Sequence, residues 1–387
     1  MASGRPSRLW PRLQVFGHAL PRLLVGRRRP RRLGRILIAH HLLLGDTIML
    51  AGLFKKLRRD YPEALIDVLV PVAWMPIFAG APYGVRALPY DPRSVDAHRK
   101  LLARGPYDWA LVPADNRWSW VAKAMGARWI TAFAGGPGGS KDWPVDEHVD
   151  WPQEAEAWGD IASRLAPGPA PAPFVAGEWP APFVAGEWPA PARPADFPAM
   201  PAAPYAVLHL GASSPHKLWP AERWQALAAA FAAAGVGVVW SAGPRELDLV
   251  RAADPAGRFP TTAGKLDLAG LWHLLAGAAV LVSPDTGVAH LARLTGTPAV
   301  VLFGPGSPII SGPGRFWRDS PFAVVWIEDI ACRDQNLIFE RPLPWVRHCW
   351  RSVAECGNPR CIQQIDENRV MQAVESVAGI RLAKDGK

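Results

Sequence analysis

The chain alternates short apolar segments with longer amphipathic ones, in two separate stretches. The apolar segments lie first at residues 35–40, 65–71, 107–113 and 128–133, and then at residues 205–211, 236–243, 278–284 and 298–304. Apolar strands separated by helices predict a parallel sheet that is covered on both faces. We therefore expect an α/β protein with two such domains facing a cleft, where ligands bind at the carboxyl ends of the strands.

A Pro-, Ala- and Gly-rich segment separates the two stretches. It contains the nonapeptide PAPFVAGEW twice in tandem, at residues 171–179 and 180–188. One duplication is too short for a repeat architecture, and a Pro-rich linker needs no core. We divide the chain into a basic arm, an N-terminal domain, a linker, a C-terminal domain and a cysteine-containing extension, at residues 1–34, 35–165, 166–204, 205–330 and 331–387.

The net charge of +9 is concentrated at the start of the chain. Ten arginines precede Ile36, and no acidic residue precedes Asp46. This pattern predicts either a disordered, solvated arm or an arm that binds an anionic membrane surface; the interleaved apolar residues favour the membrane. No segment resembles a nucleic-acid recognition element or a signal peptide. We expect a cytoplasmic protein, peripheral on the inner membrane if the arm binds lipid, with no nucleic-acid partner.

The segment LVSPDTGVAHLARLTGTPAVVLFGPGS, residues 281–307, carries the strongest signal for a ligand. A predicted strand ends at Asp285, and Thr286 and Gly287 open a helix with His290 one turn further on. Free amides at a helix N-terminus favour a phosphate. Singly, these residues would be a cap, a packing position and a surface histidine. Together with the second glycine loop, they favour a nucleotide diphosphate site.

Two other segments add polar groups at predicted strand ends. Ser213, Ser214 and Lys217 lie in HLGASSPHKLWPAERW, where a lysine can neutralise a charged leaving group, although an exposed polar loop explains them equally well. Asp46 follows the first strand and opens a helix predicted over residues 46–59. It either caps that helix or, kept charged by a pKa lowered by the helix dipole, acts as a general base.

Four cysteines lie in the C-terminal extension: Cys332, Cys349, Cys356 and Cys361. Disulfides are uncommon in a reducing cytosol, so the cysteines are either free thiols or four thiolate ligands of a structural zinc or iron ion. Their spacing is irregular and contains no CxxC pair. The clustering of all four in one segment is what supports a metal site.

Three segments taken together resemble the ADP-heptose:lipopolysaccharide heptosyltransferases of glycosyltransferase family 9. They are RILIAHHLLLGDTIML, HLGASSPHKLWPAERW and SPDTGVAHLARLTGTPAVVLFGP, and they occur in the family's order. The resemblance implies a glycosyltransferase-B fold of two Rossmann-like domains. It also implies an inverting, metal-independent transfer from ADP-heptose to a lipopolysaccharide core. Family members that glycosylate autotransporter proteins contain a cysteine-bound metal, so a protein acceptor is an alternative.

By the same resemblance, Asp46 matches the general base and Lys217 matches a lysine beside the donor phosphates. The donor-binding motif falls on Asp285, Thr286, Gly287 and His290, with Ser213 and Ser214 beside it. Glu246 matches an acidic residue that contacts the ribose. The chain departs from the family at His40, where Arg or Lys is common, and in the Gly-Pro-Gly-Ser loop at residues 304–307.

Two other functions fit the same fold. A nucleotide-sugar epimerase would turn over the donor without an acceptor. A non-catalytic membrane-associated binding protein would bind nucleotide and transfer nothing. The carboxylate of Asp46 argues against the second. The signatures of dinucleotide oxidoreductases, P-loop NTPases and serine hydrolases are absent from the sequence.

Overall fold

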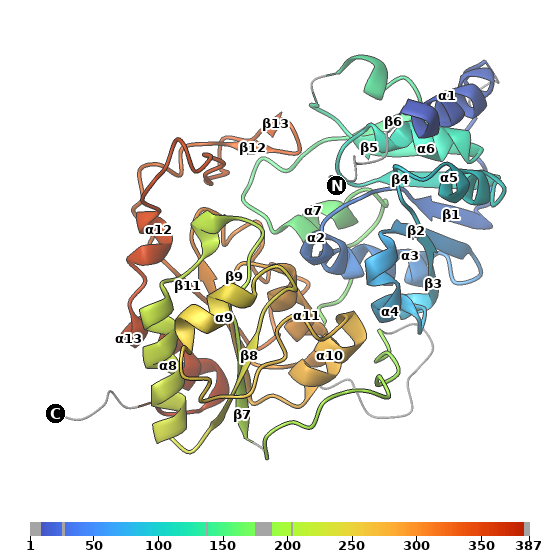
Figure 1. Cartoon of the computed structure of the whole chain (residues 1–387). Helices are drawn as coiled ribbons and strands as arrows, with labels where there is room; N and C mark the ends of the chain where they lie inside the picture. The colour runs from blue at the N-terminus through green and yellow to red at the C-terminus, as the bar shows by residue number, and fades with distance from the viewer. Residues whose placement is uncertain (1–8, 25–27, 137, 175–187, 203, 383–387) are drawn as a thin grey trace.

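Two parallel sheets, each flanked by helices, form the two halves of the computed structural model (Figure 1). The structure describes residues 9–24, 28–136, 138–174, 188–202 and 204–382. Most of the tandem copy, residues 175–187, lies outside them. The α/β class with two sheets facing each other is as predicted.

The N-terminal sheet has the strand order β3-β2-β1-β4-β5-β6, and all its pairs are parallel. Its strands are β1 (Arg35–Ile38), β2 (Leu65–Val70), β3 (Val85–Pro89), β4 (Tyr107–Val112), β5 (Ala127–Phe133) and β6 (Glu147–Val149). Its helices are α2 (Leu44–Met49), α3 (Ala51–Asp60), α4 (Met75–Phe78), α5 (Val95–Leu102), α6 (Trp118–Ala124) and α7 (Trp158–Ser163). The chain reverses direction across the sheet between β1 and β4.

The C-terminal sheet has the order β11-β10-β9-β7-β8, again all parallel. Its strands are β7 (Tyr205–His209), β8 (Gly237–Ser241), β9 (Val280–Pro284), β10 (Ala299–Phe303) and β11 (Phe322–Trp326). The helices around it are α8 (Ala221–Ala233), α9 (Leu247–Ala253), α10 (Leu268–Ala276) and α11 (Gly287–Thr295). Here the order reverses between β7 and β9. Every residue of β7, β9 and β10 is buried, as expected for parallel sheets covered on both faces, whereas the edge strand β11 is mostly half-buried.

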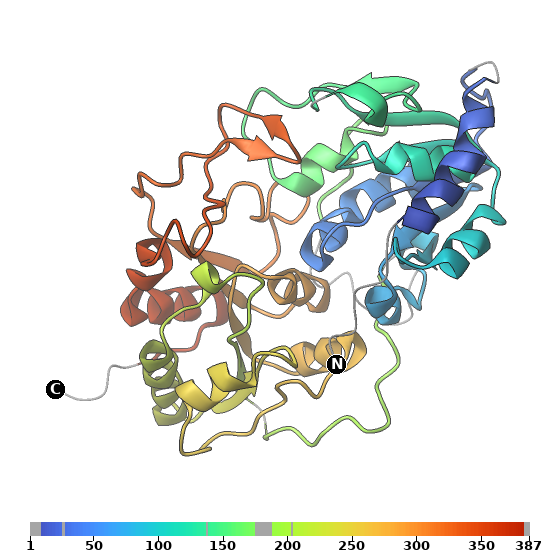
Figure 2. The ribbon, with the colours of Figure 1, turned by 45° about the horizontal axis from the view of Figure 1, so that its top comes forward.

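The C-terminal extension packs against both domains. Its hairpin of β12 (Leu337–Ile338) and β13 (Arg341–Pro342) reaches the N-terminal domain (Figure 2). There the buried Arg341 side chain donates to the carbonyls of Ala114 and Phe133. The chain then returns through α12 (Arg360–Gln363) to α13 (Glu367–Ala378), which packs on β10, β11 and α8. The extension therefore joins the two domains.

The basic arm is not disordered where the structure describes it. Residues Leu9–Leu23 form helix α1, which packs on α6 and α5 with Val15 and Ala19 buried. The prediction of a disordered arm is wrong for this segment, because one side of α1 is apolar enough to bury. No helix among the described residues is long and apolar enough to cross a bilayer.

The helix predicted over residues 46–59 is two helices, α2 and α3, with Leu50 between them. The first is only six residues long. Helix α3 is fixed by the buried ammonium of Lys56, which donates to the carbonyls of Ser163, Ala166 and Gly168 at 3.2, 2.6 and 2.9 Å. Lys56 thus satisfies carbonyls at and beyond the end of α7 that the helix itself leaves without partners.

Replacing Lys56 by Met should lower the free energy of unfolding by about 2–4 kcal/mol, because a similar apolar stem removes the donor of three carbonyls, two of which belong to buried residues. Thermal unfolding followed by circular dichroism measures the change. Lys100→Met, on the exposed side of α5, is the matched control and should unfold like the parent. Equal stability of the two variants would contradict a stabilising role for Lys56.

Candidate active site

The site lies where helix α2, which follows β1, meets the first turn of helix α11, which follows β9. The two backbones approach closely because glycines stand at the contact. A Cβ atom on Gly45 would lie 2.6 Å from Cδ2 of His290, and one on Gly287 would lie 2.9 Å from Cβ of Leu44. The carboxyl ends of β1, β7 and β9 therefore open toward one place, at the switch points of both sheets.

Asp46 occupies this contact from the side of α2. Its pKa is raised to about 6, first because protein surrounds the carboxyl and second because Asp285 faces it; Lys217 and the Leu43 backbone N–H act in the opposite direction. The prediction that the helix dipole would lower this pKa is wrong. Helix α2 is too short, and the neighbouring domain removes water from Asp46. A carboxyl with a pKa near neutrality can exchange protons.

Lys217 and Asp285 form an ion pair next to Asp46. The Lys217 ammonium donates to Oδ2 of Asp285 at 2.8 Å and to its backbone carbonyl at 2.8 Å. Lys217 ends a single turn of 3-10 helix (Pro215–Lys217) that follows β7, and Asp285 directly follows β9. The structure thus brings together the three residues that sequence analysis placed in three separate segments.

Thr286 is the N-cap residue of α11, yet its side chain makes no capping bond. Its Oγ1 is buried and has no hydrogen-bond partner, which is costly unless a ligand supplies one. Gly306, in the second glycine loop, lies beside Asp285: a Cβ atom there would be 2.5 Å from Oδ2. The loop that contains Gly306 and the start of α11 therefore lie beside the Thr286 hydroxyl, which has no hydrogen-bond partner.

The loop after β7 and the loop after β8 meet on one side of this place. Oε2 of Glu246 accepts from the Gly243 backbone N–H at 2.7 Å, and a Cβ on Gly211 would overlap the same oxygen. Ser214 caps the turn before Lys217 by accepting from the His216 backbone N–H at 3.3 Å. Ser213, one residue before it, is exposed.

His290 is buried, and its ring packs against Gly45. Its Nδ1 lies 3.1 Å from Nη1 of the buried Arg293, and burial followed by the charge of Arg293 holds its pKa well below its usual range. The ring is therefore neutral, and it contributes to the contact between the domains. Burial likewise lowers the pKa of His40, at the end of β1, to about 3.

Sequence analysis missed two aromatic residues beside Asp46. Trp158 at the start of α7 donates from Nε1 to the Asp46 backbone carbonyl at 3.1 Å, and the ring of Phe339 packs on Trp158 with centroids 4.7 Å apart. Phe339 belongs to the β12–β13 hairpin. Both residues lie far from Asp46 in sequence, so no local pattern could have identified them.

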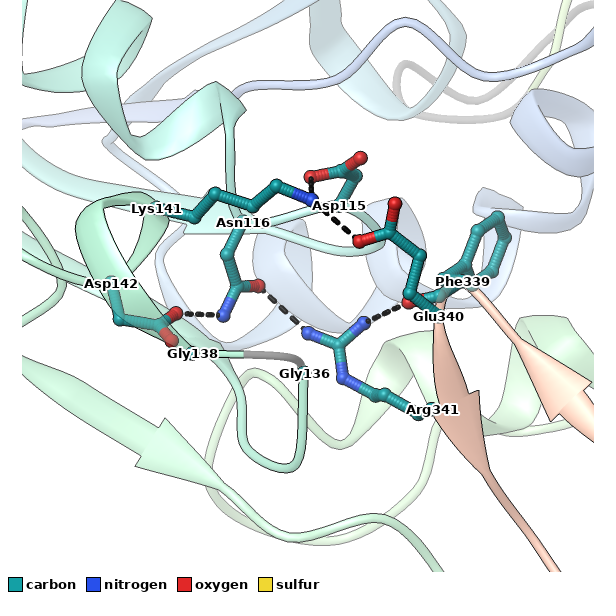
Figure 3. Close-up of a pocket in the computed structure, with 9 residues that line it drawn as sticks. All are labelled: Asp115, Asn116, Gly136, Gly138, Lys141, Asp142, Phe339, Glu340 and Arg341. Atoms are coloured by element: carbon teal, nitrogen blue, oxygen red, sulfur yellow. Dashed lines mark hydrogen bonds and ion pairs between the residues drawn. The ribbon is translucent and has the colours of Figure 1, made fainter.

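A polar pocket lies in the N-terminal domain beside this hairpin (Figure 3). Lys141 bridges Glu340 and Asp115, with its ammonium 2.5 and 3.7 Å from their carboxylates. Nη2 of Arg341 donates to Oδ1 of Asn116 at 2.9 Å. The remaining lining groups are Asp142, Phe339, Gly136 and Gly138. The pocket offers hydrogen-bonding groups of both charges at the ends of β4 and β5.

The four cysteines do not form the predicted metal cage. Within the described ranges, no group of three or more His, Cys, Asp or Glu side chains is arranged to hold a metal ion. Cys361 is buried, and burial raises the pKa of its thiol to about 11. Arg351 donates to Sγ of Cys349 at 3.6 Å. Cys332, Cys349 and Cys356 also act electrostatically on Cys361, so the four thiols lie near one another without forming such a group.

The sequence of the C-terminal domain matches the model of a known family. Residues 186–324 fit the model of glycosyltransferase family 9 (heptosyltransferase). Lipopolysaccharide heptosyltransferase 1 of Pseudomonas aeruginosa is 38% identical over 119 residues, 30% of this chain and 32% of that protein. The Escherichia coli protein of the same name is 32% identical over 117 residues, 30% of this chain and 36% of its own.

The resemblance to glycosyltransferase family 9 is confirmed. The aligned segment spans about a third of the length of these curated relatives. Solved structures extend the likeness in fold. The Escherichia coli ADP-heptose lipopolysaccharide heptosyltransferase II has a TM-score of 0.65 at 21% identity, covering 89% of this chain and 98% of that one. The fold is therefore that of glycosyltransferase-B enzymes, as predicted.

A second structural neighbour is an iron-containing dodecameric glycosyltransferase from enterotoxigenic Escherichia coli. Its TM-score is 0.56 at 16% identity, over 90% of this chain and 77% of that one. At this identity the likeness concerns the fold alone. The iron is a property of that protein and is not carried over to this chain.

Replacing Asp46 by Asn should stabilise the free protein at pH 8. A raised folded-state pKa means that Asp46 adds stability below about pH 4 and loses that contribution as the pH rises through about 6. Each pKa unit corresponds to about 1.4 kcal/mol, so the gain at pH 8 is up to about 3 kcal/mol. Differential scanning calorimetry should find a higher Tm for the variant at pH 8.

The Tm difference should shrink as the pH is lowered through about 6, because the parent then gains a proton on Asp46. Asp96→Asn, in the first turn of α5 and exposed, is the control and should show no such trend. A Tm difference independent of pH would mean that the Asp46 carboxyl is not the group with the raised pKa.

Proposed function

We propose that this protein is an inverting glycosyltransferase that moves a heptose, or a related sugar, from an ADP-sugar to a lipopolysaccharide core or similar acceptor. The observation that carries the proposal is the electrostatic interaction of Asp46 with the Lys217–Asp285 pair at the start of α11. It joins a proton acceptor on one domain to cationic and amide groups on the other. The relatives and the shared fold supply the substrate class.

In the proposed reaction, the acceptor hydroxyl attacks the anomeric carbon from the face opposite the diphosphate. A carbon–oxygen bond forms there while the bond to the diphosphate oxygen breaks, so the configuration inverts. Asp46 takes the hydroxyl proton, and ADP leaves with the electron pair. Because its pKa is about 6, Asp46 is mostly ionised at neutral pH yet basic enough to hold that proton.

The diphosphate fits the start of α11. Its negative charge grows as the bond breaks, so fixed donors help most in the transition state. We assign this role to the Lys217 ammonium, the backbone amides near Thr286 and Gly287, and the hydroxyls of Ser213 and Ser214. The unpartnered Oγ1 of Thr286 supports the assignment. In the proposed reaction these groups stabilise the negative charge of the leaving diphosphate, and no metal ion takes part.

We assign positioning roles to Asp285 and His290. Asp285 holds Lys217 through two hydrogen bonds, and His290 seats α11 against Gly45. We assign Glu246 to the hydroxyl groups of the donor ribose, and the closeness of its carboxylate to Gly211, after β7, supports this assignment. The donor thus spans the loops after β7, β8 and β9.

The acceptor side belongs to the N-terminal domain. The pocket around Lys141, Asp115 and Asn116 has an interior of about 10 Å³, too small for a sugar, and its polar groups pair with one another. We therefore assign these groups only to the edge of the acceptor site. Through Phe339 and Trp158, the pocket is linked to the backbone of Asp46. An acceptor carried by a membrane lipid would meet the donor at a membrane surface, so we propose a peripheral location on the cytoplasmic side of the inner membrane.

Asp46→Asn should lower the rate of transfer by roughly 10²–10⁴-fold and leave ADP affinity unchanged, because only the proton acceptor is lost. The parent rate should fall as the pH decreases through about 6, while the residual rate of the variant should not follow that titration. Release of ADP from ADP-heptose in the presence of acceptor measures the rate, and calorimetry measures ADP binding. Asp96→Asn is the control.

Near-normal transfer by the Asp46→Asn protein would remove Asp46 as the base. Donor turnover that needs no acceptor would favour an epimerase, and ADP binding without transfer to any acceptor would favour a binding protein. Mass spectrometry of the protein mixed with different nucleotide sugars, followed by lipid or protein acceptors, separates these outcomes and identifies the sugar.

Gly287→Val should weaken ADP binding by roughly tenfold or more. The added methyl groups crowd the amides that face the diphosphate, and the Cβ also meets Leu44. The double variant Gly287→Val, Leu44→Ala removes the contact with Leu44, and its ADP binding should stay weak. Gly357→Val, where the Cβ meets nothing within 4 Å, is the control. Recovery of affinity in the double variant would show that Gly287 serves domain contact rather than the diphosphate.

A further inference from the structure

Helix α1 has two apolar faces, one covered by protein and the other largely exposed except where Phe16 meets Trp120. The covered face carries Pro11, Val15 and Ala19, spaced four residues apart, and rests on α6 and α5. The edge of Phe16 meets the ring of Trp120 in α6, with centroids 4.8 Å apart. This packing fixes how α1 is rotated on the domain, and so fixes which residues point outward.

The outward face is apolar along the whole helix. Leu13, Phe16, Leu20 and Leu24 follow one another at helical spacings of three, four and four residues, and are 50%, 38%, 49% and 89% exposed. Trp10 beside them is 67% exposed. A surface helix normally turns a polar face to water, so a second apolar stripe opposite the docked one indicates a further partner.

The surroundings of this stripe are basic. Arg12 on the helix and Arg28, Arg31 and Arg32 just after it are exposed, and no acidic residue occurs in the first 45 positions. Arg29 lies 3.6 Å from Glu147 and is partly neutralised. An apolar helix face with a tryptophan and flanking arginines has the composition of helices that lie in the interface of anionic bilayers.

A second copy of the chain is a poorer partner for the same stripe. Two copies meeting through α1 would bring their arginine clusters together, and like charges at an interface oppose association. An anionic bilayer offers both the apolar depth for the leucines and phosphates for the arginines. The complementary charge therefore selects a lipid surface.

The position of α1 also suits this role. The helix lies on the outer side of the N-terminal domain, away from the C-terminal domain in both views (Figures 1 and 2). A membrane bound there would touch only the N-terminal domain. The C-terminal domain would stay in solution, where it can exchange a soluble nucleotide.

We propose that α1 is a membrane-docking helix: the stripe of Trp10, Leu13, Phe16, Leu20 and Leu24 enters the interface of an anionic bilayer, and Arg28, Arg31 and Arg32 contact lipid phosphates. This goes beyond the transfer reaction and does not depend on which sugar is moved. Vesicle binding and transfer to a soluble acceptor are measured separately, so either can fail alone.

The first test uses the full-length Leu13→Glu, Leu20→Glu double variant in sedimentation with phosphatidylglycerol vesicles. Binding should fall at least tenfold, because two exposed leucines that would enter the bilayer are lost and two negative charges are added. The matched control is Val72→Glu, Val353→Glu, which changes two residues that are 61% and 58% exposed elsewhere. It carries the same added charge and should bind like the parent.

The second test leaves the helix intact. The Arg28→Ala, Arg31→Ala, Arg32→Ala variant should bind phosphatidylglycerol vesicles at least tenfold more weakly, and the parent should bind phosphatidylcholine vesicles weakly as well. Circular dichroism establishes that the variants are folded. Equal vesicle binding by parent and both variants would overturn the proposal. The proposal would also be overturned if the parent did not bind vesicles but formed dimers that the Leu13→Glu, Leu20→Glu variant does not form.

Discussion

The close approach of α2 to α11 is the contact on which the candidate site is built. Gly45 and Gly287 bring the backbones together, so that Asp46 from one sheet shares its surroundings with Asp285 and Lys217 from the other. Glycine at both positions is a steric requirement, since any Cβ would press on His290 or Leu44. The same approach removes water from Asp46, and so the contact that assembles the site also sets its acidity.

The second sheet reinforces this contact through α7. The Trp158 backbone N–H donates to the carbonyl of Ile310 at 2.8 Å, and the Asp160 carboxylate accepts from the Phe316 backbone N–H at 3.1 Å. Helix α7 follows the N-terminal sheet, yet its polar groups are satisfied by the loop after β10. Lys56 holds the other end of α7. The wall behind Asp46 is therefore shared by both domains.

Much of the fold could be predicted from the sequence because strands of parallel sheets are apolar throughout and helices between them are amphipathic. The order of the motifs also placed Asp46, Lys217 and Asp285 correctly at strand ends. The acidity of Asp46 could not be predicted, because it arises from burial by the other domain. Trp158, Phe339 and the buried state of His290 depend on contacts between distant segments. Helix α1 was missed although its apolar residues recur at helical spacings, because the many arginines of the arm favoured a solvated or lipid-bound segment.

The packing of the C-terminal extension on the N-terminal domain affects the order in which the protein can fold. The Arg341 guanidinium satisfies the carbonyls of Ala114, Phe133 and Ala134 and the side chain of Asn116, all in the N-terminal domain. During synthesis these groups emerge some two hundred residues before their partner. The first domain can therefore reach its final packing only when the chain is nearly complete, which ties the maturation of one sheet to the synthesis of the other.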